Sequence, residues 1–300
     1  MSLTDKASTS TTTTSNTGSF SVKTIAVIGA GQMGAGIAQV CSMSGFPTLI
    51  WDGAPAALNR GFEGIHSRLA AGLAKGRLTS ELVESTKQNI SMAASLEDTG
   101  GCDLIIEAIV ENFEIKMDLF RKLDAATKPH TILASNTSSI SITKIAATTK
   151  KPENVVGIHF MNPVPVMKLV ELIRGLQTSE KTFSTAQALC ERLGKTTVIG
   201  IDLPGFIINR ILCPMVNEAI FLLQEGCRKE DIDLGMKLGT NHPMGPLELA
   251  DFVGLDTLLS ILQILHAELG EDKYRPCPLL IKYVEAGWYG RKVGRGFYQY

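Results

Sequence analysis

The chain has 300 residues, of which 44% are hydrophobic and 20% are charged, and its 29 basic and 30 acidic side chains give a net charge of −1. These values are typical of a globular protein of about two domains, and the near-neutral charge argues against a nucleic-acid-binding protein. No uninterrupted run of about 18 apolar residues occurs, so the sequence predicts neither a transmembrane span nor a membrane partner.

The N-terminal segment differs in composition from the rest of the chain. Of residues 1–20, twelve are Ser or Thr and only Asp5 and Lys6 are charged, which predicts a disordered tail. The tail has neither the apolar core of a secretory signal nor the arginines of a mitochondrial presequence. The six cysteines are scattered without zinc-like spacing, which favours free thiols and no metal site. We therefore expect a cytoplasmic location, with the mitochondrial matrix as the alternative.

Residues 21–202 alternate between strand and helix patterns, which predicts an α/β domain with an open, mostly parallel sheet. Short apolar runs rich in β-branched residues predict strands at 24–28, 48–51, 90–93, 103–106, 131–134, 155–160, 168–173 and 196–201. Helices are expected between the strands. One opens at Ile37, one covers 113–125, and a long helical excursion leaves the sheet at about 58–88.

Residues 203–300 show no strand pattern after the boundary that we place near 200–204. Their apolar spacing predicts helices at 207–225, 229–238, 246–268 and 278–286. We therefore expect a small all-helical C-terminal domain. Because about 100 residues bury only a limited core alone, these apolar helices are also expected to carry a contact between subunits.

A glycine-rich turn directly follows the first predicted strand. Gly29, Gly31 and Gly34 form a G-x-G-x-x-G pattern between that strand and a helix. In this context they allow a tight turn, a close approach of a pyrophosphate, and close helix–strand packing. Asp52, at the end of the second strand, can accept hydrogen bonds from ribose hydroxyls and would repel a 2′-phosphate. The pattern predicts a Rossmann-type site for NAD rather than NADP; the alternative is a plain turn with a capping Asp52.

Polar residues collect at the carboxyl ends of several predicted strands. Ligands of open α/β sheets bind at this edge, so we expect the segments to form one site. They are Gly29–Gly31, Asp52, Ala108–Glu111, Ser135–Ser138 and His159–Asn162.

A histidine and a glutamate interrupt two apolar runs on either side of a double-proline turn. If the runs pair as an antiparallel hairpin centred on Pro165, His159 lies opposite Glu171, with Cβ atoms about 5 Å apart. Such a pair can be structural, and the register can differ. Beside a nicotinamide site, however, the histidine can take a hydroxyl proton while hydride leaves the same carbon. The carboxylate would fix the tautomer and stabilise the imidazolium.

These residues belong to motifs that resemble the short-chain 3-hydroxyacyl-CoA dehydrogenase family, especially its 3-hydroxybutyryl-CoA branch. The resemblance extends in colinear order over about residues 22–300. The matching segments are 28–38, 103–108, 133–139, 159–163, 204–210, 241–247 and 286–292. The resemblance implies NAD-dependent oxidation of the 3-hydroxyl of short-chain 3-hydroxyacyl-CoA, the reverse reduction of acetoacetyl-CoA, and a homodimer formed through the helical domain.

The resemblance also implies catalytic roles for the matched positions. His159 corresponds to the catalytic base and Glu171 to its partner. Ser138 and Asn209 would hydrogen-bond the substrate oxygen, and Asn162 would help to hold the site.

Further matched positions imply binding roles. Asp52, Glu111 and Lys116 correspond to positions that contact the cofactor, and Lys75 lies where the family contacts CoA phosphates. Met161 stands where the family usually has a second phenylalanine. An apolar, flexible side chain is kept there, so we expect a small effect on packing and acyl fit.

Two other functions are considered. A related group of hydroxy-acid dehydrogenases shares the glycine fingerprint but uses a catalytic lysine, and the expected His159–Glu171 arrangement argues against it. The family also includes lens proteins that serve as structural bulk. Loss of His159, Glu171 or Ser138 would favour that second function, and all three are present.

Overall fold

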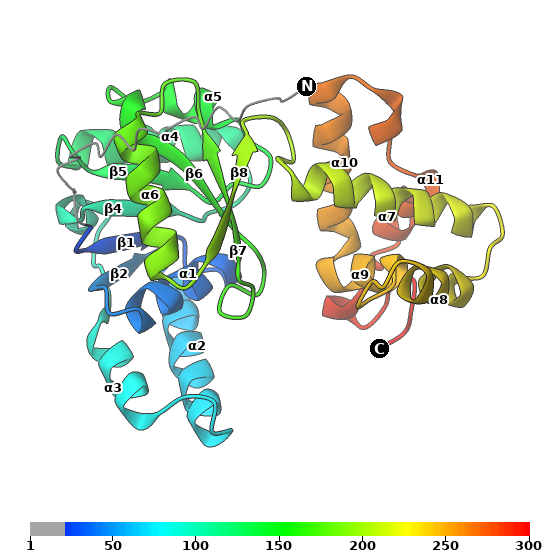
Figure 1. Cartoon of the computed structure of the whole chain (residues 1–300), viewed down its shortest axis with the longest axis horizontal. Helices are drawn as coiled ribbons and strands as arrows, with labels where there is room; N and C mark the ends of the chain where they lie inside the picture. The colour runs from blue at the N-terminus through cyan, green and yellow to red at the C-terminus, as the bar shows by residue number, and fades with distance from the viewer. Residues whose placement is uncertain (1–21) are drawn as a thin grey trace, which may run out of the picture.

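The computed structural model describes residues 22–300, and the Ser/Thr-rich segment at 1–20 lies outside the described residues. A sheet with helices packed on its faces forms one part of the molecule, and a helical unit that follows the last strand forms the other (Figure 1). The expected architecture, a doubly wound sheet followed by helices, is confirmed.

The sheet has eight strands in the order β3-β2-β1-β4-β5-β6-β7-β8. All neighbours are parallel except β6 and β7, which form an antiparallel hairpin. The central strands read as continuous apolar runs because helices cover both faces of the sheet. The strands are β1 (Ile25–Ile28), β2 (Thr48–Trp51), β3 (Ile90–Met92), β4 (Leu104–Glu107), β5 (Ile132–Ser135), β6 (Val155–Phe160), β7 (Leu169–Arg174) and β8 (Thr196–Ile201).

Helices cover the two faces of the sheet, and an apolar core lies on each side. Helices α1 (Gln32–Met43) and α6 (Glu180–Arg192) pack on one side, while α4 (Phe113–Ala126) and α5 (Ile142–Ala146) pack on the other. The expectation that the first helix opens at Ile37 is wrong, because the last turn of the glycine fingerprint is already helical. The glycine turn therefore lies at the N-terminus of α1.

The predicted helical excursion at 58–88 consists of two helices rather than one. They are α2 (Pro55–Ala74) and α3 (Ser80–Gln88), which project together from the sheet (Figure 1). Gly76 breaks the helix because it adopts φ +64°, and the Thr79 side chain accepts a hydrogen bond from the Leu82 amide at the start of α3. In the sequence, a glycine followed by a threonine at a helix-capping position is the signal for this break.

The C-terminal unit consists of helices packed around their own apolar core. The single helix expected at 246–268 is instead two helices, because Gly254 between them adopts φ +104° and the chain bends by 97°. Among residues 22–300 no single helix is long and apolar enough to span a bilayer, although this bent pair reaches the required length and composition. The helices are α7 (Ile208–Gln224), α8 (Lys229–Gly239), α9 (Pro246–Val253), α10 (Leu255–Leu269) and α11 (Pro278–Glu285).

Short 3-10 helices occur in the connections of both parts. They are η1 (Glu97–Gly101), η2 (Pro152–Asn154), η3 (Asp272–Tyr274) and η4 (Arg291–Val293).

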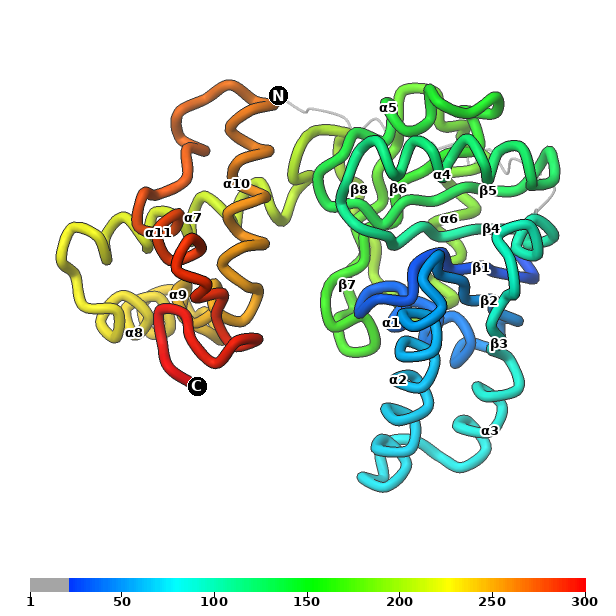
Figure 2. Tube along the Cα trace, turned by 180° about the vertical axis from the view of Figure 1, so that it is seen from behind, coloured from blue at the N-terminus to red at the C-terminus, as the bar shows by residue number. Residues whose placement is uncertain are grey.

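The chain crosses from the sheet to the helical unit between β8 and α7 (Figure 2). The carboxylate of Asp202 accepts hydrogen bonds from the Ile142 and Thr143 amides, both at 2.8 Å, and so anchors the crossing to α5. Phe206 is buried in the core on the α4 and α5 side of the sheet. The crossing is therefore packed against the sheet before α7 begins.

Candidate active site

The predicted site segments lie at the carboxyl ends of neighbouring strands. Backbone and side-chain contacts link them in pairs. The Ala30 amide donates to Asp52 Oδ2 at 2.8 Å, and Gln32 Nε2 donates to Asn162 Oδ1 at 3.1 Å. The fold thus brings these segments together at one edge of the sheet, as the topology predicts.

The three glycines of the G-x-G-x-x-G pattern differ in why glycine is needed at each position. A Cβ on Gly29, which has φ +103°, would lie 2.5 Å from the Ala108 carbonyl oxygen, and one on Gly34 would lie 1.9 Å from the Gly29 carbonyl oxygen. Neither position has room for a side chain. A Cβ on Gly31 would meet nothing within 4 Å, so no packing within the chain requires this glycine. The open space lies at the N-terminus of α1, where free N–H groups and the helix dipole favour an anionic group such as a pyrophosphate.

Asp52 is fixed beside this turn. Its Oδ2 accepts the Ala30 amide, and its Oδ1 accepts the Ala54 amide at 2.9 Å. Each carboxylate oxygen has a second lone-pair direction, so both can still accept a hydroxyl group. The residues present fit the adenosine ribose and pyrophosphate of a dinucleotide.

The predicted pairing of His159 with Glu171 is confirmed. The two residues are direct partners in the β6–β7 hairpin, and His159 Nδ1 lies 2.8 Å from Glu171 Oε2. Glu171 is completely buried and His159 is 8% exposed. Because an ionised carboxylate only accepts hydrogen bonds, Nδ1 carries the proton and Nε2 is left as the basic atom.

The second oxygen of Glu171 binds the start of the helical unit. Oε1 accepts the amides of Ile207 at 2.9 Å and Ile208 at 3.0 Å. Burial raises the pKa of Glu171, but the hydrogen bond and charge of His159 and these two amides outweigh burial and hold the pKa below its usual value. The carboxylate is therefore ionised at neutral pH. The Phe206 ring, 5.7 Å from the His159 ring, covers the pair on the side of the crossing.

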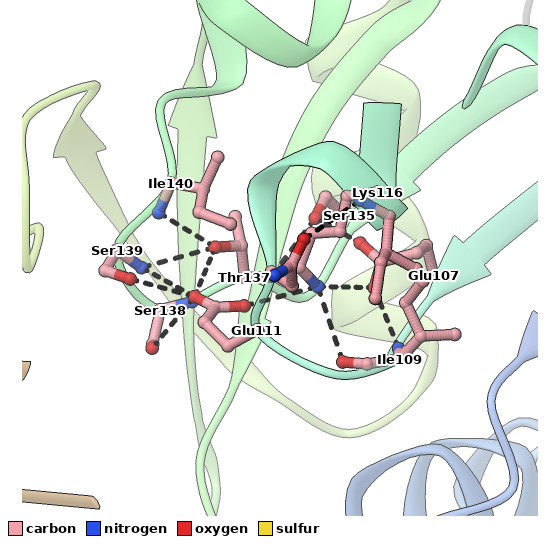
Figure 3. Close-up of polar contacts among 11 residues, drawn as sticks. Glu107, Ile109, Glu111, Lys116, Ser135, Thr137, Ser138, Ser139 and Ile140 are labelled. Atoms are coloured by element: carbon pink, nitrogen blue, oxygen red, sulfur yellow. Dashed lines mark hydrogen bonds and ion pairs between the residues drawn. The ribbon is translucent and has the colours of Figure 1, made fainter. Parts of the chain in front are cut away.

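Glu111 organises the loop that carries Ser138 (Figure 3). Its Oε1 accepts the Ser138 amide at 2.9 Å and the hydroxyls of Thr137, Ser138 and Ser139 at 2.6, 3.2 and 2.9 Å. Its Oε2 lies 3.2 Å from Lys116 Nζ. Burial raises the pKa of Glu111. The Lys116 charge and these donors lower the pKa by more than burial raises it, so it lies below its usual value.

The remaining predicted residues have different settings. Lys116 is only 1% exposed and contacts carboxylates on both sides. Asn162 is exposed at the start of the hairpin turn, while Asn209 is the second residue of α7 and is half-buried. Within residues 22–300, no hydrogen bond joins the Asn209 side chain to Ser138 or His159, so the fold places these residues without linking them directly.

Lys75 lies on the rim of a basic groove of about 650 Å³. The groove is lined by α1, the end of α2 and the turn of the β6–β7 hairpin. It is lined by five cationic side chains and by no acidic one, and these cations are Arg68, Lys75, Arg77, Lys168 and Lys195. Lys195 is 8% exposed and donates to the Val164 and Met167 carbonyls at 2.6 and 2.7 Å, which anchors the hairpin turn to β8.

Sequence reasoning missed several residues that shape the site. One is Arg68, which donates to Gln39 Oε1 at 2.7 Å and lines the groove. Glu107 was given no role, although a carboxylate at the end of the apolar run that forms β4 is a signal of a buried polar contact. Among residues 22–300, no three His, Cys, Asp or Glu side chains are grouped to hold a metal ion.

Comparison with known proteins places the chain in a family. Residues 24–202 match the NAD binding domain of 3-hydroxyacyl-CoA dehydrogenase, and residues 205–300 match its C-terminal domain. A probable 3-hydroxybutyryl-CoA dehydrogenase of Bacillus subtilis is 56% identical over 280 residues, covering 93% of this chain and 98% of that protein. The crystal structure of (S)-3-hydroxybutyryl-CoA dehydrogenase PaaH1 from Ralstonia eutropha is 47% identical, covers 93% of this chain and 99% of that one, and has a TM-score of 0.89. This chain therefore belongs to the 3-hydroxyacyl-CoA dehydrogenase family.

Proposed function

We propose that the chain oxidises the 3-hydroxyl of short-chain 3-hydroxyacyl-CoA to the 3-ketone, and catalyses the reverse reduction of acetoacetyl-CoA, with NAD as the redox partner. The reaction belongs to fatty-acid or butanoate metabolism. In the forward direction the substrate carbon loses a hydride and its hydroxyl loses a proton. The observation that carries the proposal is the buried His159–Glu171 pair, at 2.8 Å, beside a dinucleotide-binding turn.

The proton is handled by residues of this chain. His159 Nε2 takes the proton of the 3-hydroxyl, and the ionised Glu171 stabilises the imidazolium that forms. Ser138 and Asn209 hydrogen-bond the reacting oxygen, and Asn162 helps to hold the hairpin against α1 through Gln32. When bound, NAD supplies the acceptor for the hydride.

The histidine and the glutamate should work as one unit. Replacing His159 with Gln removes the base and should lower kcat by about 10²–10⁴-fold. In a Glu171→Gln variant the amide oxygen can still accept the Ile207 and Ile208 amides, but its NH₂ group then faces Nδ1. That contact forces the proton onto Nε2, so kcat should also fall steeply. The double variant should be little slower than His159→Gln alone, because both residues serve one step.

These variants are compared by steady-state kinetics of 3-hydroxybutyryl-CoA oxidation with NAD, the direction in which His159 acts as the base, with NADH affinity measured by fluorescence. His242→Gln, in the helical unit, is the control and should keep normal turnover. NADH affinity should stay near the wild-type value throughout, since the glycine turn is unchanged. Near-normal turnover of a folded His159→Gln protein would show that the pair is structural.

The position of Asp52 supports NAD rather than NADP as the cofactor. Its carboxylate is fixed by the Ala30 and Ala54 amides, and the next residues, Gly53 to Pro55, supply no cation for a 2′-phosphate. Repulsion between the two anions disfavours NADP.

We expect kcat/KM with NADH to exceed that with NADPH by at least about tenfold, which corresponds to about 1.4 kcal/mol. Asp52→Asn, which keeps one acceptor oxygen and removes the charge, should narrow this ratio. The measurement is the initial rate of acetoacetyl-CoA reduction with each nucleotide. Equal efficiency of the wild-type protein with both nucleotides would contradict the role given to Asp52.

The basic groove supports a CoA thioester as the substrate. It extends from Arg68 on α2 and Lys75, the residue after α2, to Pro163 and Lys168 at the hairpin that carries His159 and Glu171. CoA carries phosphate groups at some distance from its acyl end, so a groove that is lined by cations and reaches the hairpin carrying His159 suits it. We assign Lys75 to the CoA phosphates.

Lys75→Ala should raise the KM for acetoacetyl-CoA about fivefold, since an exposed ionic contact contributes up to about 1 kcal/mol. The KM for acetoacetyl-pantetheine, which lacks the nucleotide phosphates of CoA, should not change. Arg60→Ala, on α2 but outside the groove, is the control and should leave both values unchanged. An equal rise in KM with both substrates would mean that Lys75 acts on the fold and not on CoA.

We propose a homodimer formed through the helical unit. Several apolar side chains of α7, α8 and α9 are exposed, among them Ile211 at 68%, Leu238 at 78% and Phe252 at 44%. Exposed large apolar side chains in such number are typical of a subunit interface. Sedimentation of the full chain at micromolar concentration should give twice the monomer mass, and a monomer would refute the proposal.

All six cysteines are free thiols, which suits the proposed cytoplasmic location, with the mitochondrial matrix as the alternative.

A further inference from the structure

Glu107 is a completely buried carboxylate at the carboxyl end of β4. It lies between Ile28 on β1 and Ser135 on β5, in the centre of the sheet edge that forms the site. Three donors satisfy it: Lys116 Nζ at 2.5 Å and the Ile109 amide at 2.8 Å bind Oε1, and Ser135 Oγ at 2.6 Å binds Oε2 (Figure 3). The residue has no role in the reaction described above.

One oxygen of Glu107 leads to Ser138 through two charged side chains. Lys116 Nζ, bound to Glu107 Oε1, also lies 3.2 Å from Glu111 Oε2. The other oxygen of Glu111 accepts both the amide and the hydroxyl of Ser138. Lys116 and Glu107 are each at most 1% exposed, so water does not compete for the contact between these two side chains. We call this route the lysine arm.

The other oxygen of Glu107 leads to the same loop through Ser135. The Ser135 hydroxyl donates to Glu107 Oε2, and its oxygen accepts the Thr137 amide at 3.2 Å. Thr137 Oγ1 in turn accepts the Ile140 amide at 2.9 Å and donates to Glu111 Oε1 at 2.6 Å. We call this route the serine arm, and it meets the lysine arm at Glu111.

Burying the Lys116–Glu107 ion pair is an unfavourable way to stabilise a fold. Removing a carboxylate and an ammonium from water costs several kcal/mol for each ion, and an apolar pair of the same volume often stabilises a fold as well or better. The three residues before Glu107 are Leu104, Ile105 and Ile106, so an apolar side chain would suit the strand. The two arms give the buried charge a different use, because both end at the loop that carries Ser138.

We propose that Glu107 is a positioning residue for the dehydrogenase reaction. It holds the Ser138 side chain in the position and orientation needed to hydrogen-bond the reacting oxygen. The proposal rests on the proposed function of Ser138. Glu107 itself touches neither the substrate nor the cofactor. It fixes the loop from below, through Lys116 and Glu111 on one side and through Ser135 and Thr137 on the other.

The test is Glu107→Gln, which keeps the shape and removes the charge. If the amide oxygen keeps Lys116 and Ile109, its NH₂ group faces Ser135 Oγ, which can then no longer donate there. Ser138 should lose its position, and kcat for acetoacetyl-CoA reduction should fall by about ten- to a hundredfold, since a displacement of about 1 Å can cost that much. KM for acetoacetyl-CoA should change by less than about twofold.

A double-variant cycle with Ser138→Ala separates positioning from a general loss of stability. If Glu107 acts through Ser138, Glu107→Gln should lower kcat in the wild-type background and should have almost no further effect in the Ser138→Ala background. Equal losses in both backgrounds would overturn the inference while leaving the role of Ser138 intact. Full activity of Ser138→Ala alone would instead refute the proposed function of Ser138, and the inference with it.

Asp124→Asn is the matched control. Like Glu107, Asp124 is a buried carboxylate paired with a lysine, Lys151 at 3.4 Å. It lies near the C-terminal end of α4, away from Lys116 near the N-terminal end of that helix. This variant should lower Tm without lowering kcat. If Glu107→Gln does not fold, Ser135→Ala removes the serine arm alone, and we expect a smaller loss of kcat that also vanishes in the Ser138→Ala background. A loss that persists there would overturn the inference.

Discussion

The carboxylate of Glu171 joins the chemistry of this protein to the arrangement of its two parts. One oxygen holds His159 on the neighbouring strand, and the other holds the Ile207 and Ile208 amides at the start of α7. A buried carboxylate is stable only when donors satisfy both oxygens, so the charge needs both the histidine and the helix. The orientation of the base and the docking of the helical unit therefore depend on the same side chain. Asn209 follows one residue later, so the same contact also fixes the turn of α7 that carries it.

A common device fixes the other loops of the site. Asp52 accepts the Ala30 amide of the glycine turn, Glu111 accepts the Ser138 amide, and Asp202 accepts two amides at the start of α5. In each case an acidic side chain near a strand end binds the backbone of a different loop. Charge-assisted hydrogen bonds of this kind are short and directional, which suits loops that must hold a ligand.

The charge distribution separates the functions of the site. Acidic side chains lie along the sheet edge that we assign to the dinucleotide and the reacting carbon, while every charged side chain that lines the groove between α2 and the hairpin turn is a cation. Both regions meet at the hairpin, whose turn is anchored by Lys195 and whose strands carry His159 and Glu171. The β6–β7 hairpin, the antiparallel element in an otherwise parallel sheet, thus connects the proposed CoA site to the proposed proton transfer.

The sequence by itself determined the local patterns. The glycine fingerprint, Asp52 at a strand end and the His159–Glu171 register could all be predicted, because strand residues alternate with a period of two and equal distances from Pro165 place side chains opposite each other. The breaks at Gly76 and Gly254 were not predicted, because the helical pattern continues past each glycine and the residue type alone does not fix a positive φ. Only the tertiary structure decided that Glu171 binds the amides of residues 36 and 37 positions away, and that Glu107 and Lys116 form a buried pair below Ser138. Such contacts depend on how distant segments pack, and no periodicity within one segment encodes them.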